Sequence, residues 1–381
     1  MRLLHVHSGN LYGGVETMML TLAREGVGRS AIAHEFALAF DSRIALELRA
    51  SGVPVHRLGE VRARNPLSVI RARRRLAELL AAERYGAVIC HMPWAHAIFA
   101  PVVRRAGIAL VFWMHGASSG RHWVERWAAR TPPDLAMCNS RFTASMLPHI
   151  FPHTTAEVLY CPVAIPASRL SAAEHLALRD EFATARDAVV IVQVCRMESW
   201  KGHALLLHAL ARLRDRDWAC WQVGDAQRPH ERSYLNGLMR LAGDLEIGDR
   251  VKFLGHRSDV ARVLEAADIY CQPNTEPEPF GISFIEALGA RLPVVTTALG
   301  GALEIIDESC GLLVAPNDAG ALAEAIARLI DDADARRRLG AAGPSRARAL
   351  CDPAATLRRL DALIKGLIQA RAERSRGRIG A

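Results

Sequence analysis

Short apolar runs alternate with amphipathic stretches along most of the chain. Runs of about four to eight apolar residues predict buried strands, and apolar residues at roughly every third or fourth position predict helices that pack on them. Strands are expected at residues 3–7, 34–39, 53–58, 85–91, 110–114, 188–194, 218–223, 251–254, 268–272, 291–295 and 311–315. Helices are expected at residues 15–24, 43–51, 61–82, 203–213, 283–288, 318–331, 334–339 and 354–372. A strand at 3–7, a loop with two glycines and a helix form the start of a Rossmann-like α/β unit.

Length and composition fit a cytosolic globular protein with more than one domain. The chain has 381 residues, of which 50% are hydrophobic, so a sizeable core is available. Its longest apolar runs are far shorter than the roughly 20 residues that cross a bilayer, and its start enters a strand directly rather than a signal peptide. The eight cysteines are scattered without a C-x-x-C pair, which favours reduced, buried thiols over a zinc site or a disulfide framework.

The chain is basic, with a formal net charge of +8 and a pI near 9.3. This charge favours anionic partners such as nucleotide-sugars or membrane headgroups. The basic residues are not interleaved with aromatic ones and no nucleic-acid-binding motif is present, so nucleic acid is not an expected partner.

Two carboxylates, Glu278 and Glu286, lie in the stretch 275–304 with seven residues between them. The intervening P-F-G-I predicts a turn that leads into a helix. The N–H groups of Gly281, Ile282 and Ser283 would then lack intrahelical partners and could bind phosphate or sugar oxygens. Glu286, further along the same helix, could accept hydrogen bonds from the vicinal hydroxyls of a ribose. The alternative is that both are ordinary, solvated carboxylates of a helix. The surrounding motif residues favour the ligand site over this alternative.

This stretch resembles the donor site of the retaining GT-B glycosyltransferases of family 4, the group 1 glycosyltransferases. The resemblance covers nearly the whole chain and is strongest from residue 190 to residue 316. It implies an α/β GT-B fold, in which two Rossmann-like domains face each other across a cleft and a C-terminal helix crosses back to the N-terminal domain. The residues that match the donor motif are Glu278, Phe280, Gly281 and Glu286, with Gly300, Gly301 and Glu304 downstream.

The resemblance also implies how the chain divides into domains. Residues 1–165 would form a Rossmann-like acceptor domain and residues 166–352 a Rossmann-like nucleotide-sugar donor domain. Residues 353–381 would form the crossover helix and a basic tail that pack on the N-terminal domain. The sequence C-P-V-A-I-P at residues 161–166 departs from the family pattern, which often has an Asn-Gly-Val-Asp type of segment at this crossover.

Arg196 and Lys201 flank a loop that follows the predicted strand 188–194, in the pattern R-x4-K-G. The resemblance assigns both residues to the donor diphosphate. Two fixed cations would stabilise the charge that builds up when a nucleoside diphosphate departs, without a metal ion. A surface arginine and lysine in a basic chain are the alternative. In the family, strand ends such as the one before Arg257 line the base pocket.

Two features of the N-terminal half follow predicted strands. Gly13 and Gly14 lie in the first loop, where the resemblance implies a close approach of the backbone to the donor phosphate or the acceptor; a tight turn without a ligand is the alternative. His115 closes the strand 110–114, and ligands of open α/β sheets bind at such strand ends. The resemblance places this histidine against the donor sugar, and a histidine satisfied at a strand end is the alternative. His91 lacks comparable context and is expected to be structural.

The segment 61–82 is basic and carries an apolar stripe of Ile70, Leu76, Leu79 and Leu80. A basic amphipathic helix can lie on an anionic membrane surface, whereas a solvated helix face rich in arginine is the equally weighted alternative. Family members that modify lipid-linked acceptors bind membranes with this domain, which would place the protein in the cytoplasm or at the inner membrane face. The arginines are Arg62, Arg64, Arg71, Arg73, Arg74 and Arg75.

The activity that the resemblance implies is retaining transfer of a hexose-type sugar from a nucleoside-diphosphate sugar, UDP or GDP above all. The acceptor would be a hydroxyl of a glycan, a glycolipid or a small molecule. No cofactor or metal is expected. A non-catalytic binding subunit and a nucleotide-sugar epimerase on the same fold are the alternatives, and a nicotinamide-dependent dehydrogenase is disfavoured because no dinucleotide fingerprint is present.

The predicted site has two overlapping sets of residues. The catalytic set is Glu278, which would orient the sugar, with His115, Arg196 and Lys201. The donor-binding set is Gly13, Gly14, Arg196, Lys201, Phe280, Gly281, Ile282 and Glu286.

Overall fold

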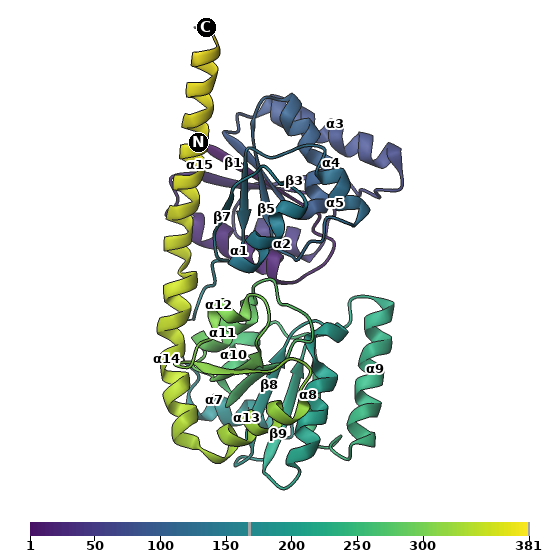
Figure 1. Cartoon of the computed structure of the whole chain (residues 1–381), viewed down its shortest axis with the longest axis vertical. Coiled ribbons are helices and arrows are strands. Elements are labelled where there is room, and N and C mark those ends of the chain that lie inside the picture. Colours follow the sequence, from purple (N-terminus) through teal and green to yellow (C-terminus); the bar gives the residue numbers. More distant parts are fainter. Residues whose placement is uncertain (167–168, 380–381) are drawn as a thin grey trace. The chain divides into compact units, whose positions relative to one another are not determined.

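The computed structural model describes residues 1–166 and 169–379, which form two compact α/β units (Figure 1). Unit 1 comprises Met1–Ala164 together with Cys351–Ala381, and unit 2 comprises Ile165–Leu350. Each unit has its own parallel sheet and its own buried core. The α/β class is confirmed, because every predicted strand run overlaps an observed strand.

The described residues of unit 1 contain a seven-stranded parallel sheet with the strand order β3-β2-β1-β4-β5-β6-β7. Helices follow most strands, as the alternating pattern predicts. The strands are β1 (Arg2–His7), β2 (Ala33–Leu38), β3 (Val55–Arg57), β4 (Ala87–His91), β5 (Ala109–Met114), β6 (Leu135–Cys138) and β7 (Ala156–Val158). The helices are α1 (Gly14–Gly26), α2 (Arg43–Ala50), α3 (Pro66–Ala82), α4 (Met92–Arg105), α5 (Trp123–Ala128), α6 (Arg141–Met146) and α15 (Pro353–Ile379).

The last helix, α15, is distant in sequence from the rest of unit 1 yet packs against α1 and β5 (Figure 1). Its buried residues include Leu357, Leu360 and Ile364, which lie on one face because they are spaced three and four positions apart. Of the expected helix-and-tail segment 353–381, residues 353–379 form α15, and residues 380–381 lie outside the described residues.

Unit 2 contains a six-stranded parallel sheet with the strand order β10-β9-β8-β11-β12-β13. Its core is built from apolar residues of the central strands and of the helices that cover them. The strands are β8 (Val189–Val194), β9 (Trp218–Val223), β10 (Val251–Gly255), β11 (Ile269–Gln272), β12 (Val294–Thr297) and β13 (Gly311–Val314). The helices are α7 (Ala172–Glu181), α8 (His203–Leu210), α9 (Pro229–Asp244), α10 (Val260–Glu265), α11 (Ile282–Gly289), α12 (Ala302–Ile305), α13 (Ala319–Asp331) and α14 (Ala333–Cys351).

Both sheets have a point at which the strand order reverses. In unit 1 this point lies between β1 and β4, and in unit 2 it lies between β8 and β11. The loops that leave two such neighbouring strands diverge, and the crevice between them is where ligands of open parallel sheets bind. The loops after β1, β8 and β11 contain most of the predicted site residues, and His115 follows β5.

Helix ends are fixed by local side-chain caps. The Asn65 side chain accepts hydrogen bonds from the N–H groups of Leu67 and Ser68, and Asp318 does the same for Gly320 and Ala321. Such caps satisfy donors that the first turn of a helix cannot bond internally. They explain why α3 and α13 begin where they do.

Candidate functional site

The loops after β8 and β11 contact each other at the reversal point of unit 2. The N–H of Thr275 donates a hydrogen bond of 2.8 Å to the carbonyl oxygen of Trp200. Gly202 has a φ of 76°, and a β-carbon on it would lie 1.8 Å from the carbonyl oxygen of Pro273. Glycine is therefore required at position 202 for two reasons, the left-handed backbone and the close approach of Pro273. The glycine of the R-x4-K-G pattern stands where the two loops meet.

Lys201 and Glu278 form a buried ion pair across these loops. Nζ of Lys201 lies 2.6 Å from Oε2 of Glu278, and the side chains are only 12% and 9% exposed. The same oxygen accepts from the amides of Gln272, at 3.1 Å, and Asn274, at 3.2 Å. Within residues 1–166 and 169–379, no hydrogen bond to Oε1 of Glu278 is found. One carboxylate oxygen is thus saturated with donors while the other is available to a ligand.

Arg196 lies on the same loop as Lys201. Its guanidinium pairs with Glu198 at 3.0 Å and is 32% exposed, so a second cation is present with part of its surface accessible. Glu198 also accepts from the indole of Trp200, whose ring lies 3.9 Å from Nζ of Lys201. A cation over an indole face is favourable, and this contact restricts where the ammonium can move.

The two glycines of the G-G-x-x-E pattern allow a second loop to press against Glu278. The backbones of Glu278 and Gly300 form a β-bridge, and the N–H of Gly301 donates to the carbonyl oxygen of Glu278 at 2.7 Å. A β-carbon on Gly300 would lie 2.4 Å from that oxygen, and one on Gly301 would lie 2.8 Å from the Cα of Phe280. Larger residues would push the Glu278 loop out of place.

Gly281 caps α11 with a φ of 105°, and a β-carbon there would lie 2.3 Å from the ring of Phe284. The N–H groups of Gly281 and Ile282 lie in the first turn of α11, where a helix offers donors without intrahelical partners. The side chain of Phe280 is only 2% exposed, so it supports the loop from the core and could contact a ligand through its backbone.

Glu286 lies on α11, four positions after Ile282, which is the first residue of the helix. Its side chain has no hydrogen-bond partner within the described residues. Desolvation by the surrounding protein raises the pKa of this carboxyl to about 7. Part of the residue still reaches the surface, so a ligand hydroxyl can approach a carboxylate that is poorly solvated and unpaired.

In unit 1, the Gly13–Gly14 loop is held by Glu16. This carboxylate accepts from the N–H of Gly13 at 2.9 Å and lies 2.7 Å from Nε2 of His7, at the end of β1. Gly13 caps α1 in an extended conformation and Gly14 is exposed. The glycines therefore present backbone beside a buried His–Glu pair, at the edge of the sheet where ligands bind.

His115 follows β5 directly and is 7% exposed. Its Nε2 lies 2.9 Å from Nδ1 of His91, and its Nδ1 is buried without a partner among the described residues. Burial, with a smaller contribution from the charge of His7, lowers the pKa of His115 to about 3. The imidazole is therefore neutral near pH 7. His91, which was expected to be structural, is the residue that orients it.

The predicted residues fall into two groups, one in each unit. Unit 2 brings Lys201 and Glu278 into contact, with the backbone of Gly281 close by in the same loop. Sequence reasoning missed the residues that hold these groups. The sequence signal that could have revealed them is a polar residue at the end of a buried strand, since Gln272 ends β11 and His7 ends β1. The missed residues are Gln272, Asn274, His7, Glu16 and His91.

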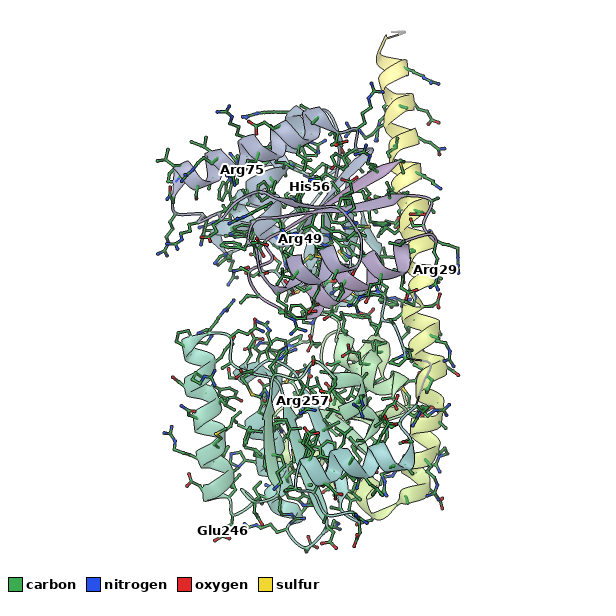
Figure 2. All side chains as sticks on the ribbon, turned by 180° about the vertical axis from the view of Figure 1, so that it is seen from behind. Arg29, Arg49, His56, Arg75, Glu246 and Arg257 are labelled. Carbon is green, nitrogen blue, oxygen red and sulfur yellow. The ribbon has the colours of Figure 1, made fainter. Side chains whose placement is uncertain are left out.

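Arg257 lies in the loop after β10 (Figure 2), and its contacts are with carboxylates of its own unit. Its guanidinium forms a fork to Asp259, with bonds of 2.8 and 2.7 Å, and a further bond of 2.7 Å to Glu181. Its CZ atom lies 5.0 Å from the ring centre of Phe182. These contacts make it a structural tie between β10 and α7 rather than a free donor for a base.

The predicted apolar stripe of α3 is partly wrong. The buried face consists of Val69, Ala72, Leu76 and Leu80, whereas Ile70 is 61% exposed and Leu67 is 67% exposed. Ile70 differs because it stands one position after Val69, about 100° around the helix.

Two of the α3 arginines donate hydrogen bonds to carbonyl oxygens outside the helix. Arg73 donates to the carbonyl oxygen of Ile98 at 2.6 Å, and Arg75, which Figure 2 labels, donates to that of Leu58 at 3.3 Å. Arg75 also lines a surface hollow with Arg57, Arg62 and Arg71. The exposed face of α3 thus combines two apolar residues with positive charge.

Two general features of the described chain bear on ligands and membranes. No group of three or more His, Cys, Asp or Glu side chains is arranged to hold a metal ion in the part that the structure describes. None of the described helices combines the length and the apolar character that a bilayer crossing needs.

Two family models match the sequence, one for each unit. The model described as Glycosyl transferases group 1 matches residues 176–346, and the model described as Glycosyltransferase Family 4 matches residues 12–165. The first match lies within unit 2 and the second lies almost entirely within unit 1. All the predicted site residues fall inside these two segments.

Curated relatives are similar over parts of the chain. The D-inositol 3-phosphate glycosyltransferase of Corynebacterium efficiens is 32% identical over 42% of this chain and 39% of its own length. The GDP-mannose-dependent alpha-(1-6)-phosphatidylinositol monomannoside mannosyltransferase of Mycolicibacterium smegmatis is 29% identical over 65% of this chain and 68% of its own length. The first relative is thus matched over less than two thirds of its length.

Solved structures are similar over nearly the whole chain. HepE of Anabaena, in complex with UDP and glucose, has a TM-score of 0.85 at 23% identity and covers 96% of this chain and 99% of its own. The sucrose-phosphate synthase of Thermosynechococcus elongatus has a TM-score of 0.80 at 20% identity, covering 97% and 99%. At these identities the likeness concerns the fold, and it confirms the predicted two-domain α/β GT-B fold.

Proposed function

The chain belongs to the group 1, family 4 glycosyltransferases, and from this we propose that it transfers a hexose-type sugar from a nucleoside-diphosphate sugar to an acceptor hydroxyl. One observation carries the proposal. In unit 2, the buried pair of Lys201 and Glu278 meets the start of α11 at the reversal point of the sheet. This arrangement combines a cation, a carboxylate oxygen without a partner and backbone donors, which are groups that a sugar diphosphate requires.

The nucleoside diphosphate would bind to unit 2. Arg196, Lys201 and the N–H groups of Gly281 and Ile282 would hold the diphosphate. Glu286 would accept from the two ribose hydroxyls, which explains why an unpaired and poorly solvated carboxyl stands on α11. Hydrogen bonds to a charged group are worth about 1.5–3 kcal/mol each, so this contact would contribute strongly to affinity.

The donor sugar would be held by Glu278 and His115. Oε2 of Glu278 is saturated, so a sugar hydroxyl would donate to Oε1. Because Lys201 and two amides hold the Glu278 carboxylate in place, we assign it to orientation of the sugar rather than to nucleophilic attack. Gly13 and Gly14 would let backbone approach the donor phosphate or the acceptor.

The proposed reaction retains the anomeric configuration. The acceptor oxygen would bond to the anomeric carbon on the face from which the diphosphate leaves, while the bond from that carbon to the phosphate oxygen breaks. The leaving phosphate would take the proton of the acceptor hydroxyl. Arg196 and Lys201 would stabilise the charge on the diphosphate as it departs, and we propose that they do so without a metal ion.

The relatives suggest classes of donor and acceptor. The Mycolicibacterium smegmatis relative is named as GDP-mannose-dependent, and HepE was solved with UDP and glucose. We therefore propose a UDP- or GDP-sugar donor. Two relatives are named for inositol-containing acceptors, so a glycolipid or another hydroxyl-bearing glycan is the proposed acceptor class.

We also propose that the protein acts in the cytoplasm, at the inner membrane face. Lipid-linked acceptors require the enzyme to reach a membrane surface. The exposed face of α3 offers Leu67 and Ile70 beside Arg71, a combination that suits the interface of an anionic bilayer.

Thermal stability with UDP, GDP, ADP and TDP tests the donor site. A nucleotide present at a hundred times its dissociation constant raises the free energy of unfolding by about 2.7 kcal/mol, which is easily measured. One nucleotide should stabilise the wild-type chain equally with and without magnesium, and Glu286→Ala should lose that stabilisation. Its sugar derivative should then yield a product with the anomeric configuration of the donor, determined by NMR.

The same experiments separate the alternatives. Stabilisation by a nucleotide without sugar transfer to any acceptor would indicate a non-catalytic binding subunit. Conversion of the nucleotide-sugar into an isomer in the absence of an acceptor would indicate an epimerase. A strict need for magnesium would contradict the proposed roles of Arg196 and Lys201.

A further inference from the structure

Four buried histidines form a hydrogen-bonded row across the sheet of unit 1. Nδ1 of His34 lies 2.9 Å from Nε2 of His5. Nδ1 of His5 lies 2.9 Å from Nε2 of His91, and Nδ1 of His91 lies 2.9 Å from Nε2 of His115. The residues belong to the neighbouring strands β2, β1 and β4 and to the end of β5. The row therefore crosses the centre of the sheet and ends at the candidate site.

All four imidazoles of the row are neutral near pH 7. Burial lowers the pKa of His34 to about 4 and that of His115 to about 3. It also lowers the pKa of His5 and His91 well below the usual value, and the neighbouring histidines add to the effect. A neutral imidazole carries one N–H and one lone pair. Each ring can therefore donate at one nitrogen only.

A row of neutral imidazoles has two possible polarities. Every bond joins an Nδ1 to an Nε2, so either all four rings carry the proton on Nε2 or all four carry it on Nδ1. A change of polarity inside the row would place two N–H groups or two lone pairs face to face. The group at one end therefore determines the tautomer at the other end.

Asp361 of α15 determines the polarity at the far end of the row. Oγ of Ser30 lies 2.9 Å from Oδ1 of Asp361 and 3.3 Å from Nε2 of His34, the longest link in the series. The carboxylate also accepts the N–H of Ala31 at 2.9 Å. An ionised carboxylate can only accept, so the single hydroxyl proton of Ser30 is donated to Asp361. Nε2 of His34 must then donate to Ser30.

Each ring in turn transmits this polarity. With its proton on Nε2, His34 accepts at Nδ1 from His5, which accepts from His91, which accepts from His115. His115 therefore carries its proton on Nε2, and its Nδ1 presents a lone pair. This is the buried atom that has no partner among the described residues. A hydroxyl can satisfy it by donating, whereas an acceptor-only phosphate oxygen cannot.

We propose that Asp361 and Ser30 act through His34, His5 and His91 to fix the Nε2-protonated tautomer of His115, so that its Nδ1 accepts a hydrogen bond from a hydroxyl of the transferred sugar. The sugar contact rests on the proposed function, whereas the tautomer is a property of unit 1 alone. Asp361, Ser30, His34, His5 and His91 are positioning residues, because they act on the sugar only through His115.

Asp361→Asn provides a near-isosteric test. The amide oxygen can still accept the N–H of Ala31, but the amide nitrogen then faces Ser30 and donates to its Oγ. The Ser30 proton turns to Nε2 of His34, and all four rings should change to the Nδ1-protonated tautomer. Two-bond 1H–15N correlation spectra of the full chain with 15N-labelled histidine distinguish the two tautomers, and a His115→Asn spectrum identifies the resonances of His115.

The kinetic readout is turnover of the nucleotide-sugar identified by nucleotide stabilisation. Asp361→Asn should lower kcat/KM about tenfold, the size of one lost hydrogen bond. The dissociation constant of the free nucleoside diphosphate should stay unchanged, because unit 2 holds that part of the donor. Glu373→Gln removes an exposed carboxylate from the same helix and should change neither the tautomers nor the kinetics.

Three outcomes would overturn the proposal in whole or in part. Wild-type tautomers in Asp361→Asn would show that Asp361 does not set the row. Reversed tautomers with wild-type kcat/KM would remove the sugar contact. A wild-type chain that transfers no sugar would overturn the proposed function and that contact together, while the spectra would still decide the role of Asp361. If Asp361→Asn does not fold, Ser30→Ala should give mixed tautomers, and an unchanged pattern would contradict the proposal.

Discussion

Nζ of Lys201 lies 2.6 Å from Oε2 of Glu278, although the two residues are 77 positions apart in the sequence. The contact joins the loop after β8 to the loop after β11, and both side chains are largely buried. Because each charge is removed from water, each depends on the other for stabilisation. The pair thus holds together the two loops from which most of the proposed donor site is built.

Lys201→Met should destabilise the chain by about 3 kcal/mol, because it leaves the charge of Glu278 buried with only neutral donors. Urea unfolding of the variant measures this loss. Lys201→Met combined with Glu278→Gln should recover most of it. Arg216→Ala breaks a more exposed pair with Asp331 and should cost less than about 1 kcal/mol. Equal losses of stability for Lys201→Met and Arg216→Ala would show that the buried pair stabilises the chain no more than the more exposed pair does.

Glu286 should make nucleotide binding depend on pH. Its carboxyl has a pKa raised by burial to about 7, and only the ionised form accepts from both ribose hydroxyls. Affinity for the stabilising nucleotide, measured by calorimetry, should therefore rise between about pH 6 and pH 8. Glu286→Gln should flatten that rise and leave only the titration of the nucleotide itself. An equal rise in both proteins would exclude Glu286 as its cause.

The same carboxyl should oppose folding at high pH. A pKa raised from 4.5 to about 7 means that the stability tied to the protonated form is complete below about pH 4.5 and is lost as the pH rises through 7. Glu286→Gln should thus be more stable than the wild type at pH 8 and similar to it at pH 4.5. Denaturant unfolding at both values checks the sign.

The buried histidines should make unit 1 sensitive to acid. The pKa of His96 is lowered by burial from 6.5 to about 4, and those of the histidine row are lowered as well. Stability from such groups is present above pH 6.5 and is lost as the pH falls towards 4, by about 1.4 kcal/mol per pH unit for each residue. Circular dichroism should show a steep acid transition. His96→Gln should shift the transition to lower pH, whereas exposed His153→Asn should not.

Gly202→Ala should disrupt the donor site. The new β-carbon would clash with the carbonyl oxygen of Pro273 and stand on a left-handed backbone, so the loops after β8 and β11 would have to separate. Nucleotide stabilisation and turnover should both fall at least about tenfold. Gly237→Ala, in α9 with open space around it, should instead raise stability by up to about 1 kcal/mol. Unchanged nucleotide binding in Gly202→Ala would contradict the importance of the loop contact.

Leu67→Ser and Ile70→Ser should weaken binding to anionic vesicles. Burial of each side chain at a membrane interface would contribute about 1.5–3 kcal/mol, so each change should reduce binding about tenfold or more in co-sedimentation. Leu303→Ser changes a similarly exposed residue of unit 2 and serves as the control. If both α3 variants bind the vesicles as strongly as the wild type does, this face of α3 is excluded as the membrane contact.

Apolar patterning predicted most of the fold, and its failures have local causes. The strand β7 (Ala156–Val158) is only partly buried, so it lacks the apolar run of a core strand. Helix α4 carries Pro101 in its interior and is almost uniformly apolar, which hides the helical period. Helix α14 extends far beyond the predicted 334–339 because Pro344 and two glycines resemble a helix end. Its glycines are packing residues: a β-carbon on Gly340 would lie 2.1 Å from the carbonyl oxygen of Arg291.

The candidate site was predictable where a motif is local and hidden where partners are distant. Lys201 and Glu278 each lie in a short sequence motif that predicts them as site residues. Glu278 is also held by Gln272, and nothing in the spacing of these residues shows which carboxylate oxygen is saturated. The histidine row joins positions 29, 86 and 24 residues apart, and only the order of strands in the sheet brings them together.

The contact between Ser30 and Asp361 spans 331 positions of the chain. During synthesis, the ribosome produces the whole histidine row and every residue of the donor motif before it reaches Asp361. A nascent chain can therefore fold most of unit 1 while the protons of the row are still unordered. Docking of α15 would then be the event that assigns them. A chain in which this helix has not docked would carry all the motif residues and still lack an oriented His115, so the protons of the row would report whether α15 is in place.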